Sequence, residues 1–486
     1  MKLFACHLVA VAAAAAEVYE VGPGKPFEKI GDAPLAALAP GDTVRVYWRP
    51  EPYREKFVLC RQGAADAPIT LRGVPGPEGQ LPVIDARDAV TASTLNYWRE
   101  NRGVIKIGGA NVPADVMPRH IVIDSLEIRS ARPPYRFTDR FGQAQTYAVN
   151  AAAIDVEKGE SLTIRNCILH DSGNGLFIGS SEENLTRDVL IEANWIHSNG
   201  IEASALHHNA YTEALGIVYQ FNYFGPPRPG SLGNNLKDRS AGLVVRYNWI
   251  EGGNRQLDLV DAGVASLRES PRYRETSAYG NILIEREGDG NRQIVHYGGD
   301  SAAPEAYRKG LLDFFNNTIV SLRERTTLFR LSTADEKCLA RNNIFYAAVG
   351  GDTVELLNGE GELALSRNWF KPGRRAAFSG PPAGRILDDG SNLEGAEPGF
   401  AGEAGQDYRI TPSSMVRDEG LAVDGLDMQY VRHQAGETRP RDGHVDLGAF
   451  EAVTSDSPQT GIRSRARFAG ASAGTARPRR TSAGGR

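Results

Sequence analysis

Short stretches of alternating apolar and polar residues make up most of this chain. Residues 162–169 (LTIRNCIL) and 243–250 (LVVRYNWI) are rich in β-branched and aromatic side chains, and Gly and Asn stand at the breaks between such stretches. A period of two is typical of strands that bury one face, whereas a helix buries every third or fourth residue. The pattern therefore predicts an all-β chain of short strands.

An asparagine recurs at the end of successive strand-like segments and is followed by two or three apolar or aromatic residues. The copies are Asn166, Asn194, Asn222, Asn248, Asn281, Asn317, Asn343 and Asn368, with Asp124 in the same place in an earlier copy. They lie 25 to 36 residues apart. The leucine-rich consensus and the propeller signature are both missing from this repeat, and several short strands per repeat match a parallel β-helix. Asn tolerates left-handed backbone angles, and stacked Asn side chains can hydrogen-bond to one another. We predict a right-handed parallel β-helix of about nine to eleven coils.

The two ends of the chain differ from the repeat. Residues 1–16 have a basic Lys2, an apolar run and small alanines, which is the pattern of a signal peptide; a frayed Ala-rich helix is the alternative. We therefore expect a secreted or periplasmic protein. No later segment approaches the ~20 apolar residues that span a bilayer. The Arg-rich residues 453–486 are predicted to be a disordered basic tail.

Between these ends, residues 17–452 are predicted to form a single β-helix domain. Residues 17–50 include a helical segment at 34–38 and form a cap over the first coil, because open strand edges invite aggregation. Residues 395–452 form a closing segment at the other end.

The composition excludes some classes of protein. The net charge of −5 gives no basic face for nucleic acid. After removal of the signal peptide, Cys60, Cys167 and Cys338 are too widely separated for a disulfide framework or a zinc site. Nothing in the sequence indicates an obligate oligomer, so we expect a monomer.

The opening VGPGKPFEKIGDA, the segment APITLRG and the ending RPRDGHVDLGAFE resemble secreted bacterial β-helix proteins of the pectate-lyase-like superfamily. Within that superfamily, LKDRSAGLVVRYNWIEGG is similar to polysaccharide lyase family 6, which includes alginate lyases and chondroitin B lyase. The resemblance implies that Lys237 is the catalytic base. That family places an arginine acid on the next coil, but RQLDLVDAG has no arginine after Arg255. The resemblance therefore does not supply the acid.

Strand alternation predicts which side chains share an outer face. If Leu236 points inward, then Asn235, Lys237 and Arg239 point outward together. If Leu257 and Leu259 are interior, Asp258 is exterior, and a turn brings Asp261 outward. The predicted strip contains catalytic candidates Lys237, Arg239, His208 and Tyr211, and substrate-binding candidates His207, Asn209, Asn235, Asp258, Asp261, His296 and Tyr297.

Such a strip can perform uronate β-elimination, which needs a cation at the carboxylate, a base for the C5 proton and an acid for the leaving oxygen. The leading hypothesis is a lyase acting on an acidic polysaccharide, with Lys237 as base and Arg239 at the carboxylate. Ca²⁺ is a possible cofactor, with Asp258, Asp261 and Asp300 as oxygen ligands.

Several alternatives stay open. Asp258 and Asp261 could be the carboxylate pair of an inverting glycoside hydrolase. An epimerase shares the first chemical step of a lyase. Lys237, Arg239 and Asp258 could also form a purely structural ladder of opposite charges in a non-catalytic glycan-binding solenoid.

Overall fold

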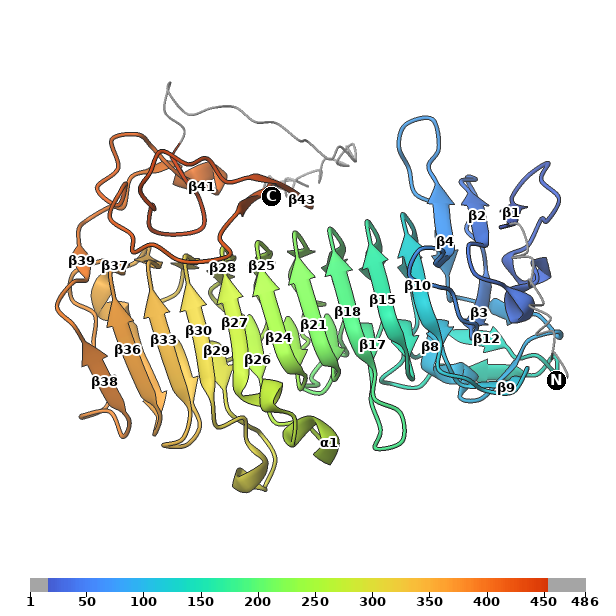
Figure 1. Ribbon diagram of the computed structural model, residues 1–486, viewed down its shortest axis with the longest axis horizontal. Helices are drawn as coiled ribbons and strands as arrows, with labels where there is room; N and C mark the ends of the chain where they lie inside the picture. Colours follow the sequence, from blue (N-terminus) through green and yellow to red (C-terminus); the bar gives the residue numbers. More distant parts are fainter. Residues whose placement is uncertain (1–15, 453–486) are drawn as a thin grey trace, which may run out of the picture.

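The computed structural model describes residues 16–452, so the predicted signal peptide, apart from Ala16, and the predicted basic tail lie outside the described residues. Three long sheets of mainly parallel strands run along the molecule, and successive strands of the chain pass from one sheet to the next (Figure 1). The fold is the predicted right-handed parallel β-helix. The second sheet has 11 strands within the described residues, which corresponds to the upper end of the predicted coil number.

The strands of the first sheet are, in spatial order, β1 (Val18–Val21), β2 (Thr43–Tyr47), β4 (Ile69–Val74), β10 (Arg119–Asp124), β15 (Glu160–Arg165), β18 (Arg187–Glu192), β21 (Leu215–Gln220), β24 (Ala241–Arg246), β27 (Glu275–Tyr279), β30 (Leu311–Phe315), β33 (Lys337–Arg341), β36 (Glu362–Ser366) and β38 (Arg385–Asp388). Those of the second are β5 (Val83–Asp85), β11 (Glu127–Arg129), β16 (Ile168–His170), β19 (Trp195–His197), β22 (Tyr223–Phe224), β25 (Trp249–Glu251), β28 (Ile282–Glu285), β31 (Thr318–Ser321), β34 (Ile344–Ala347), β37 (Trp369–Phe370) and β39 (Leu393–Glu394).

The third sheet contains β13 (Ala144–Thr146), β12 (Arg136–Thr138), β6 (Ala89–Thr91), β3 (Glu55–Leu59), β8 (Gly103–Ile107), β14 (Ala152–Val156), β17 (Asn174–Ile178), β20 (Ala210–Thr212), β23 (Leu236–Asp238), β26 (Leu257–Leu259), β29 (Gln293–Tyr297), β32 (Thr326–Leu331) and β35 (Val354–Gly359). Three antiparallel pairs lie outside these sheets: β7 (Asn96–Tyr97) with β9 (Ala110–Val112), β40 (Phe400–Gly402) with β41 (Asp407–Ile410), and β42 (Met428–Val431) with β43 (Ala435–Thr438).

Helical structure is sparse. It consists of α1 (Ala265–Arg268) and the 3-10 turns η1 (Ile30–Asp32), η2 (Leu35–Ala37), η3 (Glu100–Arg102), η4 (Pro271–Arg274), η5 (Pro304–Ala306), η6 (Gly351–Thr353) and η7 (Glu403–Gly405). The turn η2 lies within the segment predicted to be helical at the N-terminal end. The strand β1 pairs in parallel with β2, so this end already continues the first sheet. In residues 16–452 no helix has the length and apolar character needed to cross a membrane.

The repeat asparagines form a buried ladder at the turn between the first and second sheets. In this ladder an Asn donates its backbone N–H and its side-chain Nδ2–H to the Oδ1 atom of the Asn in the next coil. Asn194, for example, donates both to Asn222 Oδ1 at 3.0 Å. The ladder comprises Asn194, Asn222, Asn248, Asn281, Asn317, Asn343, Asn368 and Asn392. These bonds satisfy polar groups that the turn would otherwise bury without partners.

Three details of the predicted repeat are wrong. Asp124 is not the earlier copy of the repeat Asn, because it pairs with Arg165, and its neighbour Ser125 (φ 62°) takes the left-handed position. The ladder starts at Asn194 and not at Asn166, because Cys167 donates its backbone N–H to Asn194 and so occupies the ladder position of its coil. The left-handed backbone belongs to the residue before the ladder Asn, as in Tyr247 (φ 55°). Asn166 itself occupies that left-handed position, with φ 54°.

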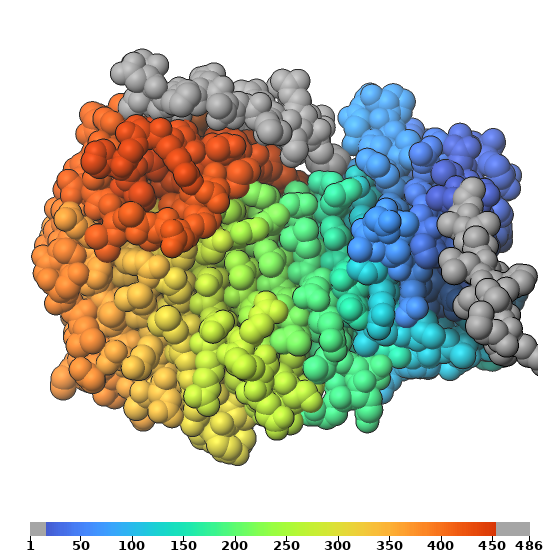
Figure 2. Space-filling view, viewed as in Figure 1, coloured from blue at the N-terminus to red at the C-terminus, as the bar shows by residue number. Residues whose placement is uncertain are grey.

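The predicted closing segment folds back along the outside of the second sheet. Residues 400–452 lie over the later coils, as Figure 2 shows. Trp249 on β25 is buried beneath Tyr408 and Tyr430, with ring centroids 5.7 and 6.1 Å away. The closing segment therefore covers an apolar face of the second sheet and leaves the outer face of the third sheet free.

Candidate active site

One row of side chains runs along the outer face of the third sheet across six neighbouring strands. Directly paired positions place Phe177, Tyr211, Lys237, Asp258, His296 and Arg330 side by side on β17, β20, β23, β26, β29 and β32. Neighbouring residues Leu236, Leu257 and Leu259 are buried in the core, as the alternation predicted. Since parallel strands lie about 4.8 Å apart, the row forms a continuous strip of chemically diverse groups.

Lys237 lies at the centre of the row and binds two carboxylates. Its Nζ atom is 2.9 Å from Asp258 Oδ2 and also donates to Asp300 Oδ2. Burial by itself lowers the pKa of an amine, but the two carboxylates outweigh it and raise the pKa of Lys237 above its usual value. Lys237 is therefore protonated at neutral pH while Asp300 is in place.

Asp258 is almost fully buried, and four donors surround its carboxylate. Oδ2 accepts from Lys237 and from Asn234 Nδ2 at 2.7 Å, whereas Oδ1 is 2.8 Å from His296 Nδ1 and 3.4 Å from Arg255 Nη1. Burial opposes ionisation, but these donors and cations hold the pKa of Asp258 far below its usual range. The carboxylate is ionised throughout the physiological range.

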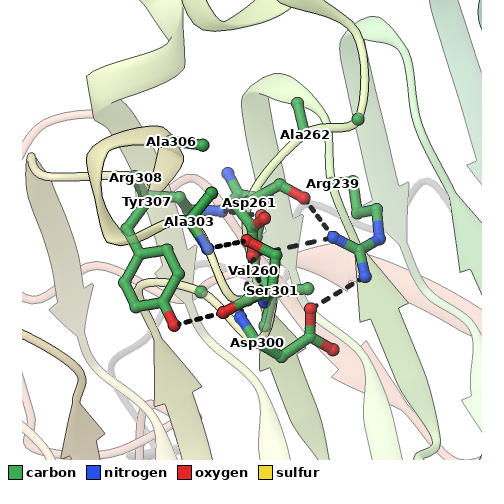
Figure 3. A network of polar contacts seen from close by, with 12 residues as sticks. Arg239, Val260, Asp261, Ala262, Asp300, Ser301, Ala303, Ala306, Tyr307 and Arg308 are labelled. Atoms are coloured by element: carbon green, nitrogen blue, oxygen red, sulfur yellow. Dashed lines mark hydrogen bonds and ion pairs between the residues drawn. The ribbon is translucent and has the colours of Figure 1, made fainter.

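Arg239 connects the row to a neighbouring loop. Its Nε donates to the Tyr211 hydroxyl oxygen at 2.9 Å. Its Nη2 donates to Asp300 Oδ1 at 2.8 Å and its Nη1 to the Asp261 carbonyl (Figure 3). The Asp261 side chain accepts the backbone N–H of Asp300 at 2.8 Å. Arg239 and Asp261 thus fix the backbone that carries Asp300 above Lys237.

Arg308 anchors the other end of this loop inside the protein. Its guanidinium donates to the carbonyls of Val260, Ser240 and Asp238 and forms an ion pair with Asp238 Oδ1 at 2.9 Å. Both Arg308 and Asp238 are fully buried. Because these acceptors satisfy the buried guanidinium, Arg308 and Asp238 form a rigid support for the loop that carries Asp300.

His208 is a neutral hydrogen-bond donor beside Tyr211. Its Nδ1 accepts the backbone N–H of Asn234 at 2.9 Å, so the imidazole proton resides on Nε2. Burial lowers the pKa of His208 to about 3, and the nearby Lys237 charge contributes to this. The His208 and Tyr211 rings meet edge to face with centroids 5.4 Å apart.

His296 joins Asp258 to a serine of the next coil. Nδ1 lies 2.8 Å from Asp258 Oδ1, and Nε2 lies 2.9 Å from Ser332 Oγ. Because Asp258 is ionised, Nδ1 carries the proton and Nε2 accepts from the Ser332 hydroxyl. Burial lowers the pKa of His296, against the effect of Asp258, so the ring is neutral at neutral pH.

Three predicted outward residues point elsewhere. Asn209 and Asn235 are fully buried in a second ladder, in which Asn209 Nδ2 donates to Asn235 Oδ1 at 2.7 Å and Asn235 Nδ2 donates to the Glu251 and Gly252 carbonyls. They hold a turn together and cannot bind substrate. Tyr297 is fully buried in the core, because a strand residue adjacent to the outward His296 must point inward. His207 is bound through Nδ1 to Ser204 on its own loop at 2.8 Å.

The structure adds residues that the predicted site lacked. Asn234 and Arg255 bind Asp258, Ser332 binds His296, and Arg330 extends the row to the fourth coil beyond that of Tyr211. Arg330 could have been found by continuing the strand alternation from His296. Ser332 could not, since it lies beyond the end of β32.

The predicted calcium ligands do not fit a calcium ion. The Asp258 and Asp300 oxygens are bound to cationic side chains, and Asp261 Oδ1 accepts backbone N–H groups. Within residues 16–452 there is no group of three or more His, Cys, Asp or Glu side chains arranged to hold a metal ion.

Neither protein-family models nor curated proteins match this chain. Among solved structures, pectate lyase Pel9A has a TM-score of 0.49 at 10% identity and covers 90% of this chain and 98% of its own. An alginate lyase from Paenibacillus sp. str. FPU-7 has a TM-score of 0.43 at 12% identity over 74% of this chain and 94% of that one. The PL6 family alginate lyase AlyGC has a TM-score of 0.37 at 12% identity over 84% and 58%. Similarity at this level says nothing of the reaction at this site.

Proposed function

We propose that this protein is a secreted or periplasmic polysaccharide-degrading enzyme, a lyase that cleaves a uronate-containing polysaccharide by β-elimination. The observation that carries the proposal is the position of the Asp300 carboxylate, which binds Lys237 with one oxygen and Arg239 with the other. A uronate carboxylate has the same shape and charge. Arg239 is therefore placed to bind a uronate carboxylate once Asp300 moves aside, with Lys237 beside the sugar ring.

Asp300 is suited to be displaced. Its side chain is 36% exposed, whereas those of Lys237 and Asp258 are 9% and 1% exposed. Asp300 is thus the carboxylate of this network that solvent reaches, and a carboxylate of the substrate can take its place without unburying Asp258. When the uronate carboxylate binds Arg239 in place of Asp300, Lys237 also loses one of the two carboxylates that bind its Nζ directly and raise its pKa. Substrate binding at Arg239 therefore favours the free amine that a base requires.

Each step of β-elimination has a residue in reach of the same strip. Arg239 neutralises the uronate carboxylate, which makes the C5 proton more acidic, and Lys237 Nζ removes that proton. The C5–H electrons form the C4=C5 double bond while the bond from C4 to the leaving oxygen breaks. The Tyr211 hydroxyl supplies the proton to that oxygen, because its own oxygen already accepts from Arg239 Nε. His208 Nε2–H is a second donor beside it.

An inverting hydrolase receives less support from the carboxylates. Asp258 and Asp300 bind the same Lys237 nitrogen. Their carboxylates therefore lie closer together than the ~6.5–9.5 Å that an inverting pair requires. Asp258 is ionised and so has no proton for a leaving group. Asp261 accepts two backbone N–H groups.

The test is incubation of the purified full chain with pectate, alginate and dermatan-type polymers, each followed by the ultraviolet absorbance of the C4=C5 unsaturated product and by reducing-end assay. A lyase raises both signals together, and Lys237→Ala abolishes both while the exposed control Lys337→Ala does not. New reducing ends without the absorbance would make the protein a hydrolase. Inversion at C5 detected by NMR without cleavage would make it an epimerase. Binding without any of these changes would contradict an enzymatic role.

A further inference from the structure

We propose that Ser332, His296 and Asp258 form a serine-nucleophile triad that hydrolyses O-acyl esters on the polysaccharide. The Ser332 hydroxyl donates to His296 Nε2 at 2.9 Å, and His296 Nδ1 donates to Asp258 Oδ1 at 2.8 Å. This is the hydrogen-bond order of a nucleophile, a general base and an orienting carboxylate, which recurs on unrelated folds. The activity is separate from β-elimination and does not depend on it.

Exposure to solvent increases from Asp258 through His296 to Ser332, as such a triad requires. Asp258 is 1% exposed and His296 is 3% exposed, whereas Ser332 is partly open to solvent. Lys237, Asn234 and Arg255 keep the carboxylate ionised and fixed in place. That charge holds the proton on His296 Nδ1, which leaves the Nε2 lone pair available to take the proton of Ser332.

Two glycines shape the surroundings of Ser332. A Cβ atom on Gly298 would lie 2.5 Å from both Cβ and Oγ of Ser332, so only a glycine allows the serine this position. The Gly299 N–H donates to Ser332 Oγ at 3.2 Å. The serine hydroxyl therefore sits against a fixed backbone and is oriented by partners on both sides.

Arg330 carries a positive charge on β32, two residues before Ser332. It is paired directly with His296 across the strands, is partly exposed, and donates to Asn358 Oδ1 at 3.2 Å. A guanidinium beside the nucleophile can stabilise the oxyanion of a tetrahedral intermediate. Arg330 also contributes to the lowered pKa of His296, which keeps the imidazole free to act as a base near neutral pH.

The reaction balances with water as the only co-reactant. Ser332 Oγ attacks the ester carbonyl carbon while His296 Nε2 takes its proton. The tetrahedral intermediate collapses, the bond to the sugar oxygen breaks, and that oxygen receives the proton from His296. Water, deprotonated by His296, then attacks the acyl-serine, and the carboxylic acid leaves as Ser332 regains its proton.

The position of the triad favours an ester carried by the same polymer. Ser332 follows β32, three strands along the third sheet from Lys237 on β23. At about 4.8 Å per strand, this separation matches a few sugar units lying along the strip. An acyl group on a sugar hydroxyl near one end would reach Ser332 while a uronate lies at Lys237.

The experiment treats the full chain with a fluorophosphonate probe and locates the adduct by peptide mass spectrometry. Release of acetate from acetylated and deacetylated pectate, and hydrolysis of p-nitrophenyl acetate, are measured in parallel. We expect labelling at Ser332 and acetate release only from the acetylated polymer. Ser332→Ala should lose the label and at least about 100-fold of the ester hydrolysis. The exposed Ser301→Ala, on the adjacent loop, should keep both.

An unlabelled Ser332, or ester hydrolysis that is equal in wild type and Ser332→Ala, would overturn the triad. Thermal melting of both variants shows whether they fold. The ultraviolet assay of the unsaturated product is independent of these measurements. A negative esterase result therefore leaves the proposed lyase activity untouched, and a negative lyase result leaves the proposed esterase activity untouched.

Discussion

Arg239 binds the carboxylate of Asp300 at 2.8 Å, and the second oxygen of that carboxylate binds Lys237. A loop residue of the protein thus occupies the place that an acidic sugar would take. The two cations occupy successive outward positions of one chain segment, on either side of the buried Asp238, and the loop that carries Asp300 is anchored by the buried Arg308. In the free site, Asp300 therefore helps to keep the base Lys237 protonated.

Replacement of Lys237 should abolish cleavage. Lys237→Ala removes the proton acceptor, and we expect a loss of about 100-fold or more in kcat. Lys237→Arg should fail equally, because a guanidinium is not deprotonated near neutral pH. Initial rates of unsaturated-product formation measure both, with Lys337→Ala as the exposed control. Activity retained in Lys237→Arg would assign the proton transfer to another group.

Asp300→Asn should shift the pH profile of cleavage toward lower pH. Asp258 and Asp300 raise the pKa of Lys237, and the catalytic form is the free amine, so the rate rises with pH up to that pKa. Removing one negative charge lowers the pKa and moves the rising limb to lower pH. The profile of kcat/KM is the measurement, and Asp335→Asn is the matched exposed control. A profile that is unchanged or moved to higher pH would show that Asp300 does not set the protonation of the base.

Arg308→Ala should destabilise both the fold and the loop that carries Asp300. The substitution leaves Asp238 as a buried charge without its counter-ion, which costs about 3–5 kcal/mol. Urea unfolding measures the loss, and limited proteolysis within residues 298–310 measures loop release. The double variant Asp238→Asn/Arg308→Met should recover part of the stability, because it removes both charges. Equal stability of wild type and Arg308→Ala would contradict the anchoring role.

Asn248→Ala should cost about 2–3 kcal/mol of unfolding free energy. The Asn248 Oδ1 atom accepts two hydrogen bonds from Asn222, and its Nδ2 donates to Tyr219, Arg246 and Asn281, all in a buried turn. The substitution leaves these partners unsatisfied in the interior. Denaturant unfolding is the measurement, and the exposed Asn111→Ala should change stability by less than about 0.5 kcal/mol. Comparable losses of unfolding free energy in the two variants would show that the ladder does not stabilise the fold.

Much of the site could be derived from strand alternation. Leu236, Leu257 and Leu259 fix which side of each strand is buried, and this is enough to place Lys237 and Asp258 on one outer face. The same rule excludes Tyr297 from the strip once His296 points outward, since adjacent residues of one strand cannot both point outward. The predicted outward direction of Asn209 and Asn235 is wrong for a different reason. Both lie at a turn, where strand alternation no longer defines the direction of a side chain.

The sequence by itself determined the β-helix, its approximate number of coils and the central Lys237–Asp258 pair, because these follow from local periodicity and from a repeat that recurs along the chain. Only the tertiary structure decided that Asp300 covers Lys237, that Ser332 meets His296, and that the closing segment lies on the second sheet and not on the site. Asp300 and Ser332 lie beyond strand ends, and the coils that contain them differ in length. Where loop length varies from coil to coil, the spacing in sequence no longer fixes the position in space, and contacts between loops are set by packing alone.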